Sequence, residues 1–292
     1  MGNGGEYHYT LVLGEYGSPL RPIVEQETLD FNSRPLFRSG SGIIELFSDE
    51  RELAPKFKFP SDSHRSGLTV IGDHWKQTEL TWFKSWLGGL VEIQIDPWAM
   101  SARSVGESRY PTKDLSNFAD WYRHLRLESG DAVFEAIKDL REAIPGLETL
   151  DAKEAGLDVR VLQATMRGPN GKTVDLPFSD LSEGQRTLIA LYVLLYCAVG
   201  EDRTLLIDEP DNFIALAEIQ PWLMKLLDRV DERNAQVILV SHHPELLDQL
   251  ADQGGVLFDR PDGRETRVLP FEPPEDSGLK ASEIIARGWE LA

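Results

Sequence analysis

Two adjacent carboxylates, Asp208 and Glu209, follow the apolar run 204–207 and precede Pro210. A continuous apolar run of this kind is typical of a buried parallel strand, and open α/β sheets place their chemistry at the carboxyl ends of such strands. Neighbouring side chains on an extended strand point in different directions, so one carboxylate can enter a Mg²⁺ shell while the other polarises a water molecule. A solvated pair of charges at a strand exit is the alternative interpretation.

A second apolar run, 237–240, ends in Ser241, His242 and His243. A histidine at the carboxyl end of a second parallel strand can donate a hydrogen bond to a phosphate oxygen or to an attacking water. Two neighbouring histidines could instead suggest a metal ligand pair. This pair lacks the i, i+4 spacing of a helical metal site and has no cysteine close by, which disfavours zinc.

The third motif consists of Ser182, Gly184 and Gln185, which open a long apolar run. Serine followed three residues later by glutamine is the pattern of a capping box, in which the two residues satisfy backbone donors at a helix start. The functional interpretation is a phosphate site, built from the hydroxyl group, a close backbone approach at Gly184 and the positive end of the helix.

Alternating helices and strands must position these motifs. The apolar pattern predicts helices over 182–199, 214–230 and 244–249, and strands over 204–207 and 236–240. Strands that alternate with helices of this length imply βαβ units and a parallel sheet. The sequence therefore predicts an α/β fold for its second half.

The first half has a different pattern. Strand-like runs at 7–13 and 22–29 are separated by a Gly/Ser/Pro turn and predict an antiparallel hairpin, whereas 48–67 is expected to be a loop. Helical spacing then appears in segments 74–87, 115–127 and 131–144. We expect three parts: a β-rich region 1–73, an inserted helical lid or arm 74–146, and a lobe 147–292 that carries the motifs.

Composition narrows the class of protein. The 30 basic and 49 acidic side chains give a net charge of −19, which argues against non-specific DNA binding through most of the surface. No apolar stretch is long enough to span a membrane, and the first residues resemble no secretory signal. The single cysteine, Cys197, lies in an apolar run and predicts a packed thiol in a reducing compartment. We therefore expect a cytoplasmic protein.

The order of the three motifs resembles the second half of an ABC-type ATPase core over about 178–269, with the signature motif first, then Walker B, then the switch histidine. The resemblance implies the cofactors ATP and Mg²⁺ and a head-to-tail dimer. It implies that Ser182, Gly184 and Gln185 contact the γ-phosphate held by the opposing subunit. It also implies that Asp208 supports Mg²⁺, that Glu209 is the general base and that His242 is the switch histidine.

Within that superfamily, the stretch EPDNFIAL at 209–216 is similar to the AAA-type ABC ATPases near the OLD nuclease, RecF and SMC proteins. Many such proteins act in bacterial anti-phage defence or DNA repair, which implies a nuclease or effector partner. Two residues depart from the family pattern. Ala215 stands where an Asp or His is expected, which puts that dimer contact in doubt, and Glu183 stands where a second glycine is commoner.

A phosphate loop of the form G-x-x-x-x-G-K-[ST] is expected ahead of the signature, and this sequence has none. The nearest match, GPNGKT at 168–173, contains Asn170-Gly171 between two strand-like runs and is interpreted as a hairpin turn. We therefore expect a fragment, or one polypeptide of a split ATPase, that is inactive alone until the loop is supplied.

Two rival functions remain: a non-hydrolysing scaffold that uses an ATPase-like lobe to bind a partner protein, and, less favoured, a membrane transporter subunit. DNA contact, if present, is expected in the arm, because segment 101–127 is locally basic. Its cations are Arg103, Arg109, Lys113, Arg123 and Arg126. The alternative for each of them is a solvated helix face of mixed charge.

Overall fold

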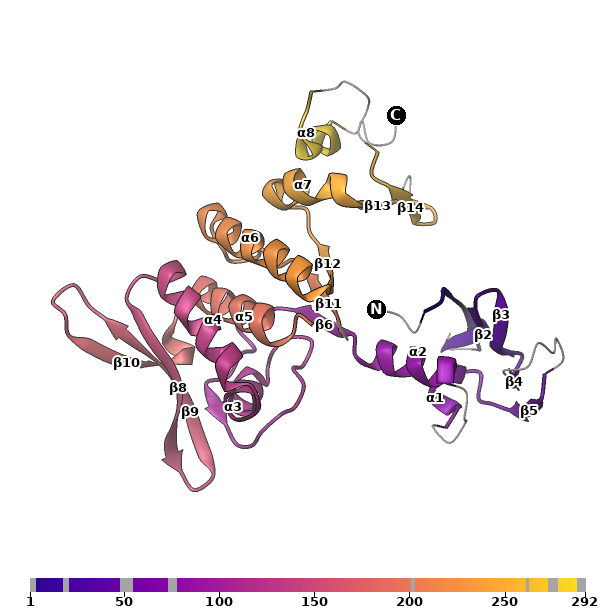
Figure 1. Cartoon of the computed structure of the whole chain (residues 1–292), viewed down its shortest axis with the longest axis horizontal. Helices are drawn as coiled ribbons and strands as arrows, with labels where there is room; N and C mark the ends of the chain where they lie inside the picture. Colours follow the sequence, from indigo (N-terminus) through magenta and orange to yellow (C-terminus); the bar gives the residue numbers. More distant parts are fainter. Residues whose placement is uncertain are drawn as a thin grey trace. The chain divides into compact units, whose positions relative to one another are not determined.

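The structure, a computed structural model, describes residues 4–17, 21–47, 55–72, 78–200, 203–260, 263–272 and 278–287. It divides into two compact units, Met1–Leu90 and Val91–Ala292 (Figure 1). Parts of the predicted loop at 48–67 and of the predicted helix at 74–87 lie outside the described residues. No helix in the described ranges has both the length and the apolar character needed to cross a membrane.

The first unit is built on a five-stranded antiparallel sheet in the order β1-β2-β3-β4-β5. Its strands are β1 (Tyr7–Tyr16), β2 (Arg21–Phe31), β3 (Arg34–Gly40), β4 (Ile43–Leu46) and β5 (Phe57–Pro60). The short helix α1 (Gly67–Val70) and the helix α2 (Thr78–Gly88) contribute to the same core, in which Leu80 and Phe83 of α2 join Leu29 and Phe37 of the sheet. The predicted hairpin is confirmed, and β5 replaces part of the predicted loop.

The second unit contains the predicted parallel sheet, with the strand order β12-β11-β6. Strand β11 (Thr204–Asp208) lies between β6 (Val91–Gln94) and β12 (Gln236–Val240), and both neighbours are parallel to it. The amphipathic helix α6 (Leu216–Arg233) and the almost wholly buried helix α5 (Glu183–Cys197) pack against this sheet through one apolar core. The α/β class is therefore confirmed.

A second sheet in this unit is antiparallel. Its strands are β7 (Arg103–Ser104), β8 (Leu147–Gly156), β9 (Val159–Arg167) and β10 (Thr173–Pro177). The β9–β10 hairpin turns at Asn170-Gly171, and Gly171 has the positive φ of 75° that such a turn requires. The segment GPNGKT thus lies in a hairpin and does not open a helix, as the sequence predicts.

Helices α3 (Phe118–Glu128) and α4 (Gly130–Ala143) pack in the main core of the second unit, where Phe118 stacks on Phe178. The structure thus groups the predicted segment 74–146 differently, because α2 buries its apolar face in the first unit and α3 and α4 bury theirs in the second.

The C-terminal part follows the parallel sheet. Helix α7 (Pro244–Leu250), the antiparallel strands β13 (Val256–Asp259) and β14 (Arg267–Pro270), and helix α8 (Ala281–Ala286) have a small apolar core of their own around Phe271 and Ile284.

Candidate functional site

The carboxyl ends of the three parallel strands carry polar side chains that contact one another. Asp208 is the last residue of β11, and one of its carboxylate oxygens accepts a hydrogen bond of 3.1 Å from Nε2 of Gln94, the last residue of β6. Gln94 and Asp208 are paired positions in the register of the two strands. A carboxylate and a side-chain amide group therefore stand side by side at this edge, with the amide nitrogen facing the carboxylate.

Glu209 reaches the neighbour on the other side of β11. Its Oε1 lies 2.9 Å from Nδ1 of His242, which follows β12. The two adjacent carboxylates therefore bond to opposite neighbouring strands, in agreement with the different directions that the sequence predicts. The other oxygen, Oε2, is buried and has no hydrogen-bond partner among the described residues.

The backbone at Glu209 has an unusual conformation. Its φ is 51°, in the left-handed region that residues with a Cβ seldom adopt. The Glu209 N–H donates to the carbonyl oxygen of Val240 at 2.8 Å, and the Glu209 carbonyl accepts from Asn212 N–H at 3.2 Å. These bonds fix the turn that follows β11 and hold the carboxylate beside His242. Strain held in this way is common at functional sites.

The hydrogen bond with Glu209 and the negative charge of its carboxylate raise the pKa of His242 above its ordinary value of 6.5. The imidazole ring itself is open to solvent, with 82% of the side chain exposed. Nδ1 faces the carboxylate, so the rest of the ring is accessible to a ligand. His242 can therefore act as a hydrogen-bond donor to a ligand through the exposed part of its ring.

The two neighbours of His242 have structural roles. The Ser241 hydroxyl donates to the buried Asp211 at 2.6 Å and accepts from His243 N–H at 2.9 Å. His243 caps α7, because its Nδ1 accepts from Glu245 N–H at 3.2 Å. No group of three or more potential metal ligands of the His, Cys, Asp and Glu types occurs in the described part of the chain.

Gln94 and Lys113 are site residues that sequence reasoning missed. Lys113 forms an ion pair of 2.5 Å with Glu92, and its carbonyl oxygen accepts from Gln94 N–H at 2.8 Å. The hydrogen bond with Glu92 and the charge of its carboxylate raise the pKa of Lys113. The charge of Asp208 raises it further. The amino-acid sequence of β6 does not show that this strand pairs with β11, so local pattern could not place Gln94 in the site.

The residues predicted to form the signature motif lie at the start of α5, where they form a capping box. The Ser182 hydroxyl accepts from Gln185 N–H at 3.2 Å, and Gln185 Oε1 accepts from Ser182 N–H at 3.1 Å. Packing requires glycine at position 184, because a Cβ there would stand 2.7 Å from the carbonyl oxygen of Phe213. No hydrogen bond or ion pair of the described residues joins this cap to Asp208, Glu209 or His242.

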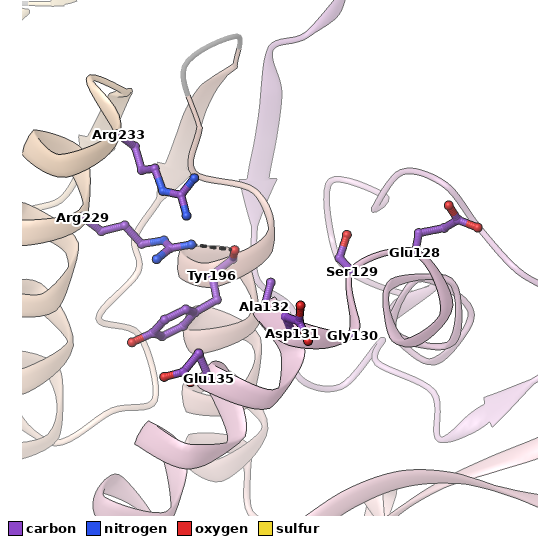
Figure 2. Close-up of a pocket in the computed structure, with 9 residues that line it drawn as sticks. All are labelled: Glu128, Ser129, Gly130, Asp131, Ala132, Glu135, Tyr196, Arg229 and Arg233. Atoms are coloured by element: carbon purple, nitrogen blue, oxygen red, sulfur yellow. Dashed lines mark hydrogen bonds between the residues drawn. The ribbon is translucent and has the colours of Figure 1, made fainter.

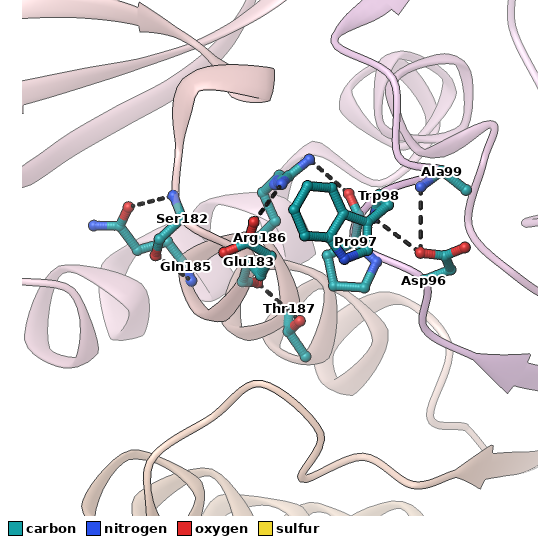
Figure 3. A network of polar contacts seen from close by, with 9 residues as sticks. All are labelled: Asp96, Pro97, Trp98, Ala99, Ser182, Glu183, Gln185, Arg186 and Thr187. Carbon is teal, nitrogen blue, oxygen red and sulfur yellow. Dashed lines mark hydrogen bonds and ion pairs between the residues drawn. The ribbon is translucent and has the colours of Figure 1, made fainter.

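Arg186 links the start of α5 to the loop after β6 (Figure 3). Its guanidinium is buried, with the residue 6% exposed, and Nη1 donates to the carbonyl oxygen of Pro97 at 2.6 Å. Nη2 lies 3.7 Å from Glu183, so the acid in the signature is paired within its own helix. The centroid of the Trp98 ring lies 6.0 Å from Cζ of Arg186, and Trp98 is 72% exposed.

The loop that carries Trp98 is fixed on its other side as well. Asp96 Oδ1 accepts from Trp98 N–H at 2.9 Å and the Asp96 carbonyl accepts from Ala99 N–H at 3.0 Å, which closes a tight turn (Figure 3). A large apolar ring is therefore exposed to solvent on a well-anchored loop two residues beyond Asp96.

The carboxyl edge of the sheet suits a hard cation such as Mg²⁺. Mg²⁺ prefers oxygen ligands and keeps several water molecules. Asp208 has carboxylate oxygens to offer, and Gln94 bonds to Asp208 through Nε2, which leaves its amide oxygen outside that bond. The unpartnered Oε2 of Glu209 is an acceptor that a water molecule could use. The residues present therefore fit the ion that the sequence predicts.

The basic side chains of segment 101–127 are largely neutralised by acids. Lys113 pairs with Glu92, while Arg123 lies 3.6 Å from Glu107 and Arg126 lies 3.2 Å from Asp151. Arg109 stacks instead on the ring of Tyr110. This pattern favours the solvated face of mixed charge over a phosphate-binding surface.

Comparison with known proteins gives three findings. The family model described as "AAA domain, putative AbiEii toxin, Type IV TA system" matches residues 101–248. The ABC transporter ATP-binding protein ARB1 of Saccharomyces cerevisiae is 37% identical over 81 residues, which are 28% of this chain and 12% of that protein. The crystal structure of the Smc head domain with a coiled coil and joint from Pyrococcus yayanosii matches 60% of this chain and 32% of its own, with a TM-score of 0.41 and 14% identity.

Proposed function

This chain belongs to the AAA-domain family whose model covers residues 101–248, and on that premise we propose that it hydrolyses ATP as part of an ABC-type ATPase. One observation carries the proposal. Two carboxylates at the end of β11 separate into an Asp208–Gln94 pair and a Glu209–His242 pair. The first pair suits a cation and the second suits proton transfer from water.

Each residue then has a distinct role. Bound Mg²⁺ would neutralise phosphate charge, with Asp208 and Gln94 as its protein oxygens. Glu209 accepts the proton of the attacking water through Oε2, and His242 orients that carboxylate through Oε1. The exposed side of the imidazole donates to a phosphate oxygen. Because no covalent intermediate is needed, positioning and charge stabilisation supply most of the rate.

A phosphate-binding loop remains to be supplied, and we place it on an added strand at the outer edge of β12. Strand β12 pairs with β11 and with no other strand of the described residues. Ile238 and Val240 are 41% and 46% exposed on it, although parallel strands are normally covered on both faces. A strand added there in parallel would end beside His242 and Glu209.

We propose that two such subunits associate head to tail, so that Ser182, Gly184 and Gln185 face the nucleotide of the other subunit. Three exposed apolar side chains near the start of α5 support a contact surface there: Trp98, Phe213 and Leu216. Trp98 is anchored through Arg186, and Phe213 contacts Gly184 through its carbonyl group. Anchored aromatic side chains are common at the centres of protein interfaces.

A nuclease or effector subunit in bacterial defence or repair is the proposed partner of this ATPase. The family description, which names a toxin and a toxin–antitoxin system, supports an effector of this kind.

DNA contact through the arm is a separate proposal, and it rests on two residues. Of the five cations in segment 101–127, only Arg103 and Arg109 lack an ion pair in the described residues. Charge reversal at both residues should reduce DNA affinity and its salt slope. Unchanged values would reject DNA contact through the arm.

A non-hydrolysing scaffold is the second candidate, favoured by the hairpin position of GPNGKT. Mg-ATP titration of the chain by calorimetry, followed by ATPase assays with the loop-bearing strand supplied, tests both candidates. We expect weak binding by the chain alone, turnover once the loop is present, and loss of turnover in Glu209→Gln with retention of an ATP-bound dimer. The matched control Glu232→Gln, on the exposed face of α6, should not change turnover.

Three outcomes would each contradict a part of this proposal. Turnover that is unchanged in Glu209→Gln would show that Glu209 is not the general base. Micromolar Mg-ATP affinity of this chain alone, abolished by Lys172→Ala, would move the phosphate site into the β9–β10 hairpin. Absence of turnover in every preparation, with a partner still bound, would establish the scaffold.

A further inference from the structure

A cavity of about 480 Å³ lies between the end of α5, the end of α6 and the start of α4 (Figure 2). Tyr196 on α5 and Arg229 and Arg233 on α6 line it, opposite residues at the α3–α4 junction. Tyr196 and Ser182 stand near opposite ends of α5, whose 15 residues span about 22 Å at a rise of about 1.5 Å per residue. The cavity is therefore remote from the signature cap.

The two arginines share one face of α6, because they are four residues apart on the same helix. Arg229 is anchored: Nη2 donates to the Tyr196 carbonyl oxygen at 3.1 Å, and the guanidinium lies 4.6 Å from the centroid of the Tyr196 ring. Its Nε is buried and has no acceptor in the described part of the chain. Within the described residues, neither guanidinium lies within ion-pair distance of a carboxylate.

The opposite wall carries acids that do not neutralise these arginines. The carboxylate of Glu135 is 3.0 Å from Lys138 on its own helix. Figure 2 shows the Glu128 carboxylate turned away from both guanidinium groups. Asp131 and Glu135 line the cavity from α4, whereas Arg233 lines it from α6. The cavity thus has cationic donors on one wall and carboxylate acceptors on the other.

Guanidinium groups bind phosphate and carboxylate through paired hydrogen bonds, and a pair without acid partners is well suited to this. Carboxylates across the same cavity accept hydrogen bonds from hydroxyl or amino groups. The volume is in the range of sites for small molecules. We propose that this cavity binds a small anionic molecule, with its phosphate or carboxylate at Arg229 and Arg233 and its hydroxyl or amino donors at Asp131 and Glu135.

The architecture around Tyr196 makes the site rigid. The Tyr196 hydroxyl donates to the buried carboxylate of Asp139, which also forms an ion pair of 2.8 Å with Lys225 of α6. Helices α4, α5 and α6 are joined at this point by side chains that a ligand does not need to displace. A preformed site of this kind loses little conformational entropy on binding.

Calorimetry with the whole chain tests the proposal, using glycerol phosphate, inorganic phosphate and glutamate at one ionic strength. Glycerol phosphate tighter than glutamate would identify a phosphate ligand, and the reverse order would identify a carboxylate. Inorganic phosphate should bind more weakly than glycerol phosphate, because it lacks the glycerol moiety whose hydroxyl groups would reach Asp131. We expect Arg233→Gln to weaken binding about tenfold, the scale of one charge-assisted contact.

Arg233→Gln is the informative variant, since Arg229→Gln also removes the contact with Tyr196. Arg233→Lys should recover part of the affinity, and Asp131→Asn should weaken glycerol phosphate more than inorganic phosphate. The matched control Arg264→Gln removes one exposed arginine outside the cavity and should leave binding unchanged. No saturable binding of any probe at millimolar concentration, or equal binding by Arg233→Gln and Arg264→Gln, would overturn the proposal. Neither result depends on ATP hydrolysis.

Discussion

The carbonyl oxygen of Phe213 approaches Gly184 so closely that a methyl group on Gly184 would lie 2.7 Å from it. The φ of Phe213 is 70°, a left-handed conformation that a bulky residue rarely adopts. The segment after β11 is thus held against the first turn of α5. The contact requires glycine at position 184 of the helix and a strained backbone at Phe213 of the segment.

Gly184→Ala should therefore destabilise the protein. Overpacking against a backbone atom costs about 1–3 kcal/mol, and the reduced freedom of the unfolded chain returns only a fraction of this. Urea unfolding measures the change. Gly88→Ala in α2 is a matched control, since its Cβ would meet open space. Equal stability of the two variants would contradict the close approach.

Arg186→Gln should loosen the loop that carries Trp98. The substitution leaves the Pro97 carbonyl oxygen without its buried donor, at a cost of about 1–3 kcal/mol. Amide exchange at residues 96, 98 and 99 should accelerate while exchange in α6 stays unchanged. The exposed Arg103 offers a control, and Arg103→Gln should alter neither measurement. Unaltered exchange in Arg186→Gln would show that the loop is held by Asp96 alone.

The titration of His242 should have its midpoint above 6.5, because the carboxylate of Glu209 favours the imidazolium. A folded-state pKa above the unfolded one contributes stability below the unfolded pKa, and this contribution is lost as pH rises through the folded pKa. NMR of the imidazole protons measures the midpoint. In Glu209→Gln it should fall towards 6.5, and an unshifted midpoint would exclude the bond between the two side chains.

Cys197 should be unreactive in the folded protein. Burial raises the pKa of its thiol from 9.0 to about 12, which lowers the thiolate fraction roughly a thousandfold at neutral pH. Alkylation at mildly alkaline pH should be slow in buffer and fast in denaturant, with mass spectrometry as the readout. Cys197→Ala supplies the unlabelled reference. Rapid labelling under native conditions would contradict a packed thiol.

The elements nearest the motifs were predictable from the sequence. The strand at 236–240 has the predicted bounds, and the strand at 204–207 gains only Asp208, because short apolar runs between polar residues mark buried strands clearly. The pairing of Asp208 with Gln94 was not predictable. It depends on β6 crossing from a distant part of the chain to lie beside β11, and local periodicity contains no information on such pairing.

The grouping of helices was also beyond the sequence. The segments 74–87 and 131–144 have the same kind of apolar spacing, yet α2 packs with the antiparallel sheet and α4 with the main core. Amphipathic spacing shows that a helix has a buried face and leaves the identity of its neighbour open. Glu209 illustrates a further limit, since its left-handed φ arises from tertiary bonds to Val240 and Asn212.

The capping box at α5 does not use the hydroxyl proton of its serine, Ser182. Within the described ranges the Ser182 oxygen only accepts a hydrogen bond, from Gln185 N–H, so its single hydroxyl proton is still available for donation. Likewise Gln185 engages its carbonyl oxygen and keeps both amide protons. The helix start can therefore retain its full internal bonding and still offer three protons to an anion, and the structural and ligand-binding interpretations of this motif are compatible in one conformation.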